Sequence, residues 1–180
     1  AAQDIVLTSP IDCSLGDDCY IQQYVDHTDG KGASDFRCSS LSYNRHKGTD
    51  FAVRTLRQMR QGVNVTASAA GTVKATRNGV EDVIYSAENA DKVSGNECGN
   101  GVVISHGNGW ETQYCHMKNK SLKVRKGQKV QAGTVLGQIG LSGRTQFPHV
   151  HLSVRKNGKV IDPFDPDGKI TCGAPDPQGM

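Results

Sequence analysis

Residues 147–154 read Phe-Pro-His-Val-His-Leu-Ser-Val, and this stretch has the alternation of a β-strand. Because successive side chains of a strand point to opposite faces, His149 and His151 lie on one face, and the apolar side chains beside them supply the other. Two neutral imidazoles on a rigid strand could place one ring on a metal ion and the other against a substrate. The same pattern also fits two histidines at the surface or at the edge of the core. The stretch by itself leaves both interpretations open.

The composition of the 180-residue chain favours many short strands over long helices. Glycine is frequent, with 21 residues, and aromatic residues make up only 6% of the chain. Short strands joined by glycine-containing turns fit this mixture, so we expect a mainly β fold. The net charge is +3, and the basic residues form no block dense enough for nucleic acid. Since no apolar run reaches the length of a membrane span either, we expect neither a nucleic-acid partner nor a membrane span.

The cysteines and the first residue indicate an oxidising compartment. The six cysteines form an even set without a CxxC pair, which favours disulfides over a zinc ribbon. We predict three pairs, one local, one across a hairpin and one that ties the two ends of the chain: Cys13–Cys19, Cys98–Cys115 and Cys38–Cys172. The chain starts at Ala1 rather than at Met, which suggests a processed amino terminus. A secreted or periplasmic location follows from these expectations.

We expect three parts along the chain. Asp and Gly punctuate residues 1–42 and no apolar period persists there, so this part is predicted to be an irregular arm tied by disulfides. Residues 43–165 carry the strand patterns and form the main domain, and the proline-rich residues 166–180 form an extended tail. Within the main domain we predict one helical turn at 54–61 and short strands at 63–67, 70–75, 80–87, 123–130 and 133–140.

A second fragment with metal-binding chemistry is His46-Lys47-Gly48-Thr49-Asp50. Gly48 and Thr49 disfavour a helix, and the following Phe-Ala-Val indicates that a strand begins at Asp50. An imidazole and a carboxylate at the start of a strand are plausible zinc ligands. A turn in which Asp50 hydrogen-bonds nearby backbone fits slightly better if the fragment is considered alone.

A third fragment places His116 at the end of a hairpin. Residues 102–106 and 110–116 read as two strands around the turn Gly107-Asn108-Gly109, and this hairpin would bring Cys98 close to Cys115. Functional groups often emerge where strands end, so His116 is a candidate. Tyr114 is expected on the same face as His116, more as a packing residue than as a catalytic one. His27 and His106 lack such a context and are assigned to the surface and to strand packing.

Taken together in this order, the fragments resemble the lysostaphin/LytM-type zinc endopeptidases. The resemblance covers residues 43–165 and rests on six segments: Arg45–Phe51, Ala70–Val73, Gly99–His106, Thr112–Met117, Val124–Val130 and Pro148–Leu152. It differs at Cys115, which stands where the family usually has a small residue, and at Gln146-Phe147-Pro148, which replaces a Thr-Gly-Pro-like approach. Residues 1–42 match nothing in the family core.

The resemblance implies an antiparallel β core, long loops that wall a groove, and one Zn²⁺ per chain. Its metal ligands would be His46, Asp50 and His151, and its unliganded catalytic histidines would be His116 and His149. Two His and one Asp leave a position for water, as in catalytic zinc sites. Spacing does not say which of the two histidines is the general base.

The implied function is that of a bacterial, monomeric zinc endopeptidase acting on the stem peptides and cross-bridges of peptidoglycan. The cleaved bond stays open between Gly-Gly, Gly-Ala and a D-Ala cross-link. The alternative is a catalytically silent domain of the same fold that binds cell wall or activates another hydrolase. The intact set of five site residues favours the enzyme.

Overall fold

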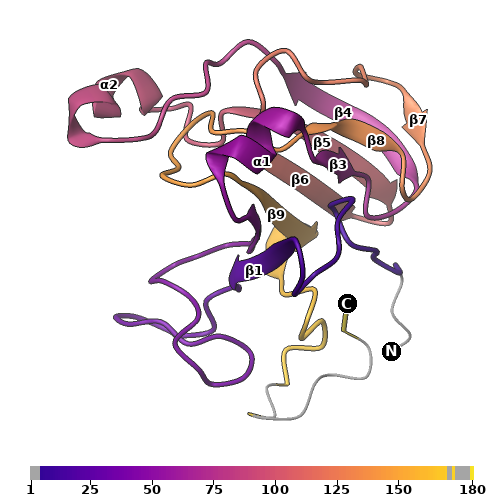
Figure 1. Ribbon diagram of the computed structural model, residues 1–180. Coiled ribbons are helices and arrows are strands. Elements are labelled where there is room, and N and C mark those ends of the chain that lie inside the picture. The colour runs from indigo at the N-terminus through magenta and orange to yellow at the C-terminus, as the bar shows by residue number, and fades with distance from the viewer. Residues whose placement is uncertain (1–4, 170–171, 173–178) are drawn as a thin grey trace.

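The computed structural model describes residues 5–169, 172, 179 and 180, and within them the fold is mainly β (Figure 1). An eight-stranded antiparallel sheet forms the main layer, in the order β1-β2-β9-β6-β5-β4-β7 with β10 paired to β9. The bounds of these strands are β1 Cys19–Gln23, β2 Thr49–Val53, β4 Gly71–Arg77, β5 Asn100–Gly107, β6 Trp110–Met117, β7 Lys129–Val130, β9 His149–Lys156 and β10 Lys159–Ile161. The expected fold class is confirmed.

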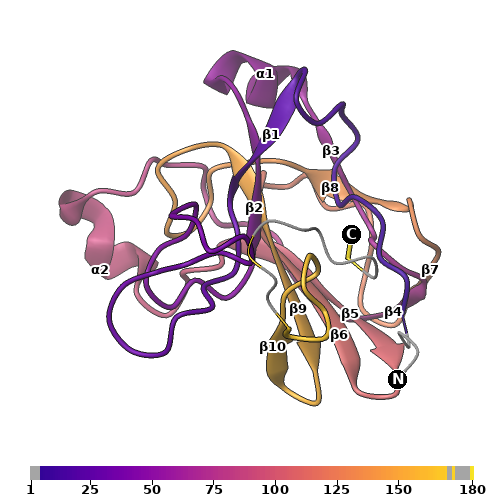
Figure 2. The same ribbon diagram turned by 90° about the horizontal axis from the view of Figure 1, so that it is seen from below.

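A smaller sheet and a short helix lie on one face of the main sheet, as Figure 1 shows. The smaller sheet pairs β3 (Asn64–Thr66) with β8 (Val135–Gln138), and the helix is α1 (Leu56–Gln61). The second helical segment, 3-10 turn η1 (Ala87–Asn89) followed by α2 (Ala90–Val93), projects away from the sheets in both Figure 1 and Figure 2. Among the described residues, no helix combines the length and the apolar character needed to cross a membrane.

Helix α1 confirms the helical turn predicted over 54–61. Thr55 caps its start, because its hydroxyl accepts a hydrogen bond from the N–H of Gln58 at 3.1 Å. Gly62 ends the helix with a φ of 95°, a conformation that residues with a Cβ rarely adopt.

The hydrophobic core lies between the main sheet and the β3–β8 pair. Val150, Leu152 and Val154 of β9 are all within 1% of complete burial, while His149, His151 and Ser153 alternate with them. This confirms the period of two predicted for the strand. One face of the main sheet therefore packs against the core, and the opposite face carries polar side chains.

The three predicted disulfides are all present and use all six cysteines. Cys98–Cys115 links the segment before β5 to β6, and Cys13–Cys19 closes the loop that leads into β1. Cys38–Cys172 joins the first part of the chain to the last. The remainder of the tail predicted for 166–180 falls largely outside the described residues.

Three local predictions of secondary structure are wrong. Residues 1–42 are not irregular throughout, because Cys19–Gln23 form β1, which pairs antiparallel with β2 at one edge of the main sheet. An edge strand is only partly buried, so its sequence lacks the apolar alternation on which the prediction relied. No strand spans 80–87, where Asp82 makes only an isolated bridge to Ser142. Of the strand predicted at 123–130, only Lys129–Val130 (β7) form one. The division of the chain into 1–42, 43–165 and 166–180 itself stays a prediction.

Candidate metal centre and groove

Three side chains that were predicted as ligands meet on the polar face of the sheet. His46 Nε2 lies 3.2 Å from Asp50 Oδ1 and 3.2 Å from His151 Nδ1, and the last two atoms are 2.8 Å apart. Two imidazole nitrogens and one carboxylate oxygen at such distances could hold a metal ion. The other cluster with ligand-type atoms, at Cys13, Asp18 and Cys19, has both its sulfurs in a disulfide and therefore offers no thiolate.

The sheet register brings Asp50 and His151 together. In the β2–β9 pair, Asp50 is directly opposite His151, so both side chains leave the same face. Gly48 lets the preceding loop pass closely over β9, because a Cβ there would lie 2.5 Å from His151 Nε2 and 2.6 Å from the Leu152 carbonyl oxygen. This close approach explains the glycine between the two candidate ligands His46 and Asp50.

The ring of His46 is oriented from the first part of the chain. Its Nδ1–H donates to the carbonyl oxygen of Tyr24 at 2.7 Å, which leaves the Nε2 lone pair facing Asp50 and His151. The phenol ring of Tyr43 stacks on the other side, with ring centroids 4.3 Å apart. Sequence analysis did not find Tyr24, since a backbone carbonyl has no signal in residue type.

His116 and His149 lie beside the three ligand atoms without joining them. The ring centroids of His116 and His149 are 4.7 Å apart, and those of His116 and His151 are 6.1 Å apart. His116 Nδ1–H donates to the Ser142 carbonyl oxygen at 2.8 Å. Both rings are buried, and His149 Nε2 is 3.4 Å from Asp50 Oδ1.

The backbone of His116 corrects the prediction that Tyr114 shares its face. His116 has a φ of 63°, in the left-handed region, and this interrupts the alternation at the end of β6. Tyr114 is completely buried in the core, where its hydroxyl accepts the Ser68 N–H at 2.8 Å, whereas His116 opens onto the polar face beside Cys115. The role in packing preferred for Tyr114 fits this position.

Burial and mutual contacts set the charges of the cluster. Burial alone would raise the pKa of Asp50, but its polar contacts with the rings of His149, His151 and His46 outweigh burial and hold that pKa well below its usual value. Burial, together with the neighbouring imidazoles, lowers the pKa of His116 to about 3. Burial also lowers the pKa of His151, against the attraction of Asp50. The cluster thus combines an ionised carboxylate at Asp50 with neutral imidazoles at His116 and His151, and a carboxylate and a neutral imidazole are the forms that bind a metal.

A groove runs across this cluster. Two cavities of about 320 Å³ and about 470 Å³ share Tyr43, His116, Arg144 and His151, so they meet at the cluster. The larger cavity is walled by residues of β1 and of the loop before β9: Gln22, Gln23, Thr145, Gln146 and Phe147. Sequence analysis expected loops to wall the groove, but not the residues of β1.

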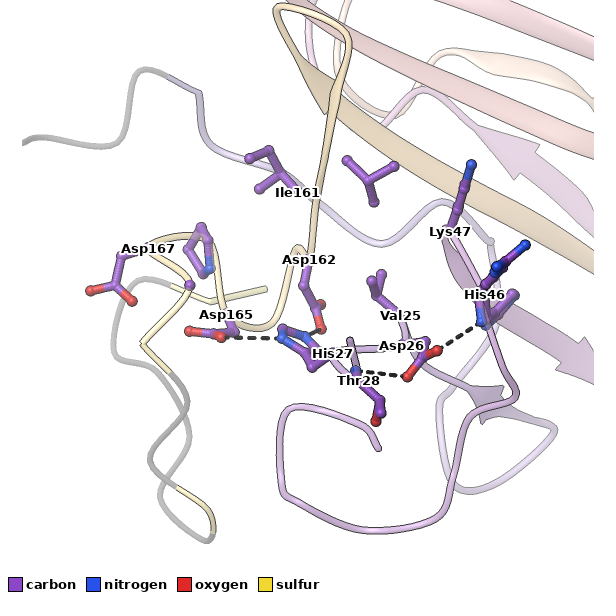
Figure 3. A pocket seen from close by; sticks show the side chains of 14 residues that line it. Val25, Asp26, His27, Thr28, His46, Lys47, Ile161, Asp162, Asp165 and Asp167 are labelled. Atoms are coloured by element: carbon purple, nitrogen blue, oxygen red, sulfur yellow. Dashed lines mark hydrogen bonds and ion pairs between the residues drawn. The ribbon is translucent and has the colours of Figure 1, made fainter. Parts of the chain in front are cut away.

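A separate cavity of about 430 Å³ lies behind His46 (Figure 3). There His27 is placed between two carboxylates, with Nε2 2.7 Å from Asp162 Oδ2 and Nδ1 3.8 Å from Asp165 Oδ2. Asp26 accepts the N–H of Arg45 at 2.7 Å and donates its own N–H to the carbonyl oxygen of His46. These contacts join the segment after β1 both to the end of β10 and to the loop that carries His46. His27 was assigned to the surface or to packing, and its side chain is only 14% exposed.

Comparison with known proteins identifies the family. Residues 44–163 match the model of peptidase family M23, and the chain therefore belongs to this family. The peptidoglycan DD-endopeptidase ShyA of Vibrio cholerae is 35% identical over 117 residues, which are 65% of this chain and 22% of ShyA. The chain spans about a fifth of the length of the curated relatives it matches.

Solved structures show the same fold. A zinc-containing peptidase from Vibrio cholerae aligns with a TM-score of 0.50 and 25% identity, covering 78% of this chain and 38% of that one. A chain of the SpoIIIAH–SpoIIQ complex aligns with a TM-score of 0.60 and 20% identity, covering 87% of this chain and 96% of that one. The second likeness concerns the fold alone. The resemblance seen in the sequence is thus confirmed at the level of the family.

The surroundings of His27 predict a pH-dependent contribution to stability. The hydrogen bond to Asp162 raises the pKa of His27 against the effect of burial, with further support from the charges of Asp162, Asp165 and Asp26. Because the pKa of His27 is higher in the folded state, protonated His27 stabilises the fold. This contribution is complete below the unfolded-state pKa of about 6.5 and is lost as pH rises through the folded-state pKa. His27→Asn should therefore cost more unfolding free energy at about pH 5.5 than at about pH 8.5 in urea titrations.

His106 supplies the control for this measurement. Burial lowers the pKa of His106, so His106→Asn should show the opposite trend, because protonation of a buried neutral imidazole destabilises the wild type at low pH. A cost of His27→Asn that does not vary with pH would contradict the prediction.

Proposed function

We propose that the chain is a zinc-dependent endopeptidase that hydrolyses peptide cross-links of bacterial peptidoglycan. The observation that carries this proposal is the meeting of His46, Asp50 and His151 on the floor of a groove, with two further imidazoles beside them. Membership in peptidase family M23 and the name of the relative ShyA support the same substrate class.

The donor set fits zinc. His46 Nε2, Asp50 Oδ1 and His151 Nδ1 would hold the ion, and three protein ligands leave a fourth position open, as catalytic zinc requires. Bound there, zinc would supply Lewis acidity towards the scissile carbonyl and a lower pKa for water. The Tyr24 carbonyl would act behind His46 as the partner that fixes the ring of a metal ligand.

His116 and His149 are suited to move the protons of the reaction. The Nδ1–H of His116 is engaged by the Ser142 carbonyl, so its Nε2 presents a lone pair. His149 Nδ1 lies 3.0 Å from the Phe147 carbonyl oxygen, and this partner leaves its Nε2 in the same state. Either nitrogen can take a proton from an attacking water and return it to the leaving amine.

The chemistry would reside in residues 43–165, which include the matched residues 44–163. Residues 1–42 would brace this domain, because Tyr24 holds His46 while Gln22 and Gln23 wall the groove. Three disulfides support a secreted or periplasmic location. We propose that the protein acts as a monomer.

The alternative is a silent domain of the same fold that binds cell wall or activates another hydrolase. Such a domain needs no ligand set and no neutral imidazoles. The five residues His46, Asp50, His116, His149 and His151 are all in place around the cluster, which favours the enzyme.

His151→Ala should abolish both metal retention and lysis. Without this imidazole, two protein ligands remain, too few for a stable zinc site. Zinc content after dialysis and the loss of turbidity of cell-wall suspensions measure the two effects. His106→Asn, away from the cluster, should keep both. Lysis that persists in metal-free His151→Ala would exclude the proposed mechanism.

His149→Ala should retain one zinc per chain and lose most of its turnover. A proton-transfer residue contributes about 10²–10⁴-fold to rate without being a ligand. Zinc content and the rate of release of new amino groups from cell wall separate the two roles. Loss of stoichiometric zinc in this variant would instead make His149 a ligand.

A further inference from the structure

The two halves of the groove differ in charge. The larger half is the cavity of about 470 Å³. Apart from the residues that line both cavities, its walls are neutral side chains such as Gln22, Tyr85 and Phe147, with Asp50 at the candidate metal site. The half with about 320 Å³ adds Lys47 and Arg155, and Glu97 is the carboxylate among its lining residues. Peptide that crosses the cluster would therefore pass from a neutral half into a basic one.

Arg155 is held on the groove floor by the strands that carry the site. It follows His149, His151 and Ser153 at alternate positions of β9, so its side chain leaves the same face. One guanidinium nitrogen, Nη2, donates to Gln113 Oε1 of β6 at 2.7 Å. Arginine has five N–H donors, and this contact orients the group while using one of them.

The backbone of Lys47 is held between the cluster and Arg155. It follows His46 directly, and its carbonyl oxygen accepts the hydroxyl of Ser153 at 2.8 Å. Ser153 lies two residues from His151 and two from Arg155, or roughly 7 Å from each at the rise of a strand. Lys47 and Arg155 both line the same half of the groove, next to the candidate metal site, and Lys47 also lines the separate cavity that contains Asp26 and Asp162.

Neighbouring carboxylates do not neutralise this pair. Glu111 is directly opposite Arg155 in the β6–β9 register, but it is ion-paired with Lys74. Among the described residues, neither Lys47 nor Arg155 has a carboxylate within ion-pair distance. Arg144, at the junction of the two halves, stacks over Tyr85 at 5.3 Å and adds a third positive charge.

We infer that Lys47 and Arg155 form a subsite for a carboxylate of the substrate, within a few residues of the scissile bond. This inference rests on the proposed function and names the substrate class. Direct cross-links between peptidoglycan stem peptides carry free carboxylates on their diamino-acid and glutamyl residues, whereas glycine-rich bridges are neutral. Arginine pairs well with carboxylate through two parallel N–H donors. The groove therefore selects carboxylate-bearing stem-peptide cross-links over glycine bridges.

The test compares one cross-linked stem-peptide dimer with the same dimer whose carboxylates are converted to carboxamides. The wild type should cleave the acidic dimer with a kcat/KM about tenfold higher, as expected for charge-assisted hydrogen bonds. Lys47→Gln/Arg155→Gln should lose most of this preference, measured as the ratio of the kcat/KM values for the two dimers. Lys47→Gln alone, at an exposed position, should lose part of it.

Arg125→Gln/Lys126→Gln is the matched control. It removes the same two charges from exposed positions that do not line the groove, so it should keep the preference. An equal loss in both double variants would show general attraction to an anionic polymer and overturn the subsite. Equal cleavage of the two dimers by the wild type would overturn it as well.

If the protein is not a peptidase, the carboxylate subsite can still be tested by binding. If the wild type cleaves neither dimer, binding of the two dimers measured by calorimetry still decides the subsite. Tighter binding of the acidic dimer, weakened by salt and lost only in Lys47→Gln/Arg155→Gln, would support it. Equal binding of both dimers would exclude it.

Discussion

The register between β2 and β9 is the constraint on which the site depends. It places Asp50 opposite His151 and Ala52 opposite His149, so that one small residue leaves room beside the second imidazole. A slip by one residue would turn the histidines of β9 into the core and Val150 and Leu152 outward. The burial of those apolar residues therefore fixes the geometry of the candidate metal centre from the opposite face of the sheet.

The sheet positions two of the candidate ligands, and elements outside β2 and β9 orient the other histidines. His46 is aligned by the Tyr24 carbonyl, which follows β1, and His116 by the Ser142 carbonyl, in the loop before β9. A cross-link between Cys98 and Cys115 fixes the end of β6 next to His116. Preorganisation of this kind costs no reordering when a metal or substrate binds. It also makes residues 1–42 part of the site, since Tyr24 belongs to them.

Most of the fold and the candidate cluster could be predicted because their signals are local. The alternation at 149–154, the glycine hairpin and the spacing of His46 and Asp50 each show within a few residues. Of the three cysteine pairs, Cys98–Cys115 followed from the hairpin that it joins. The rest depends on long-range or backbone features. Strand β1 pairs at an edge without apolar alternation, the Tyr24 carbonyl has no residue signature, and the left-handed backbone of His116 reverses the face expected for Tyr114. The catalytic and ligand roles of the five residues stay predictions.

Zinc K-edge X-ray absorption on the reconstituted protein tests the central claim most directly. The account predicts one zinc per chain with only nitrogen and oxygen neighbours at about 2.0–2.2 Å, from two imidazoles, one carboxylate and solvent. Sulfur neighbours at about 2.3 Å would place the metal on cysteine instead. Either that result or the absence of stoichiometric zinc would contradict the assignment of His46, Asp50 and His151.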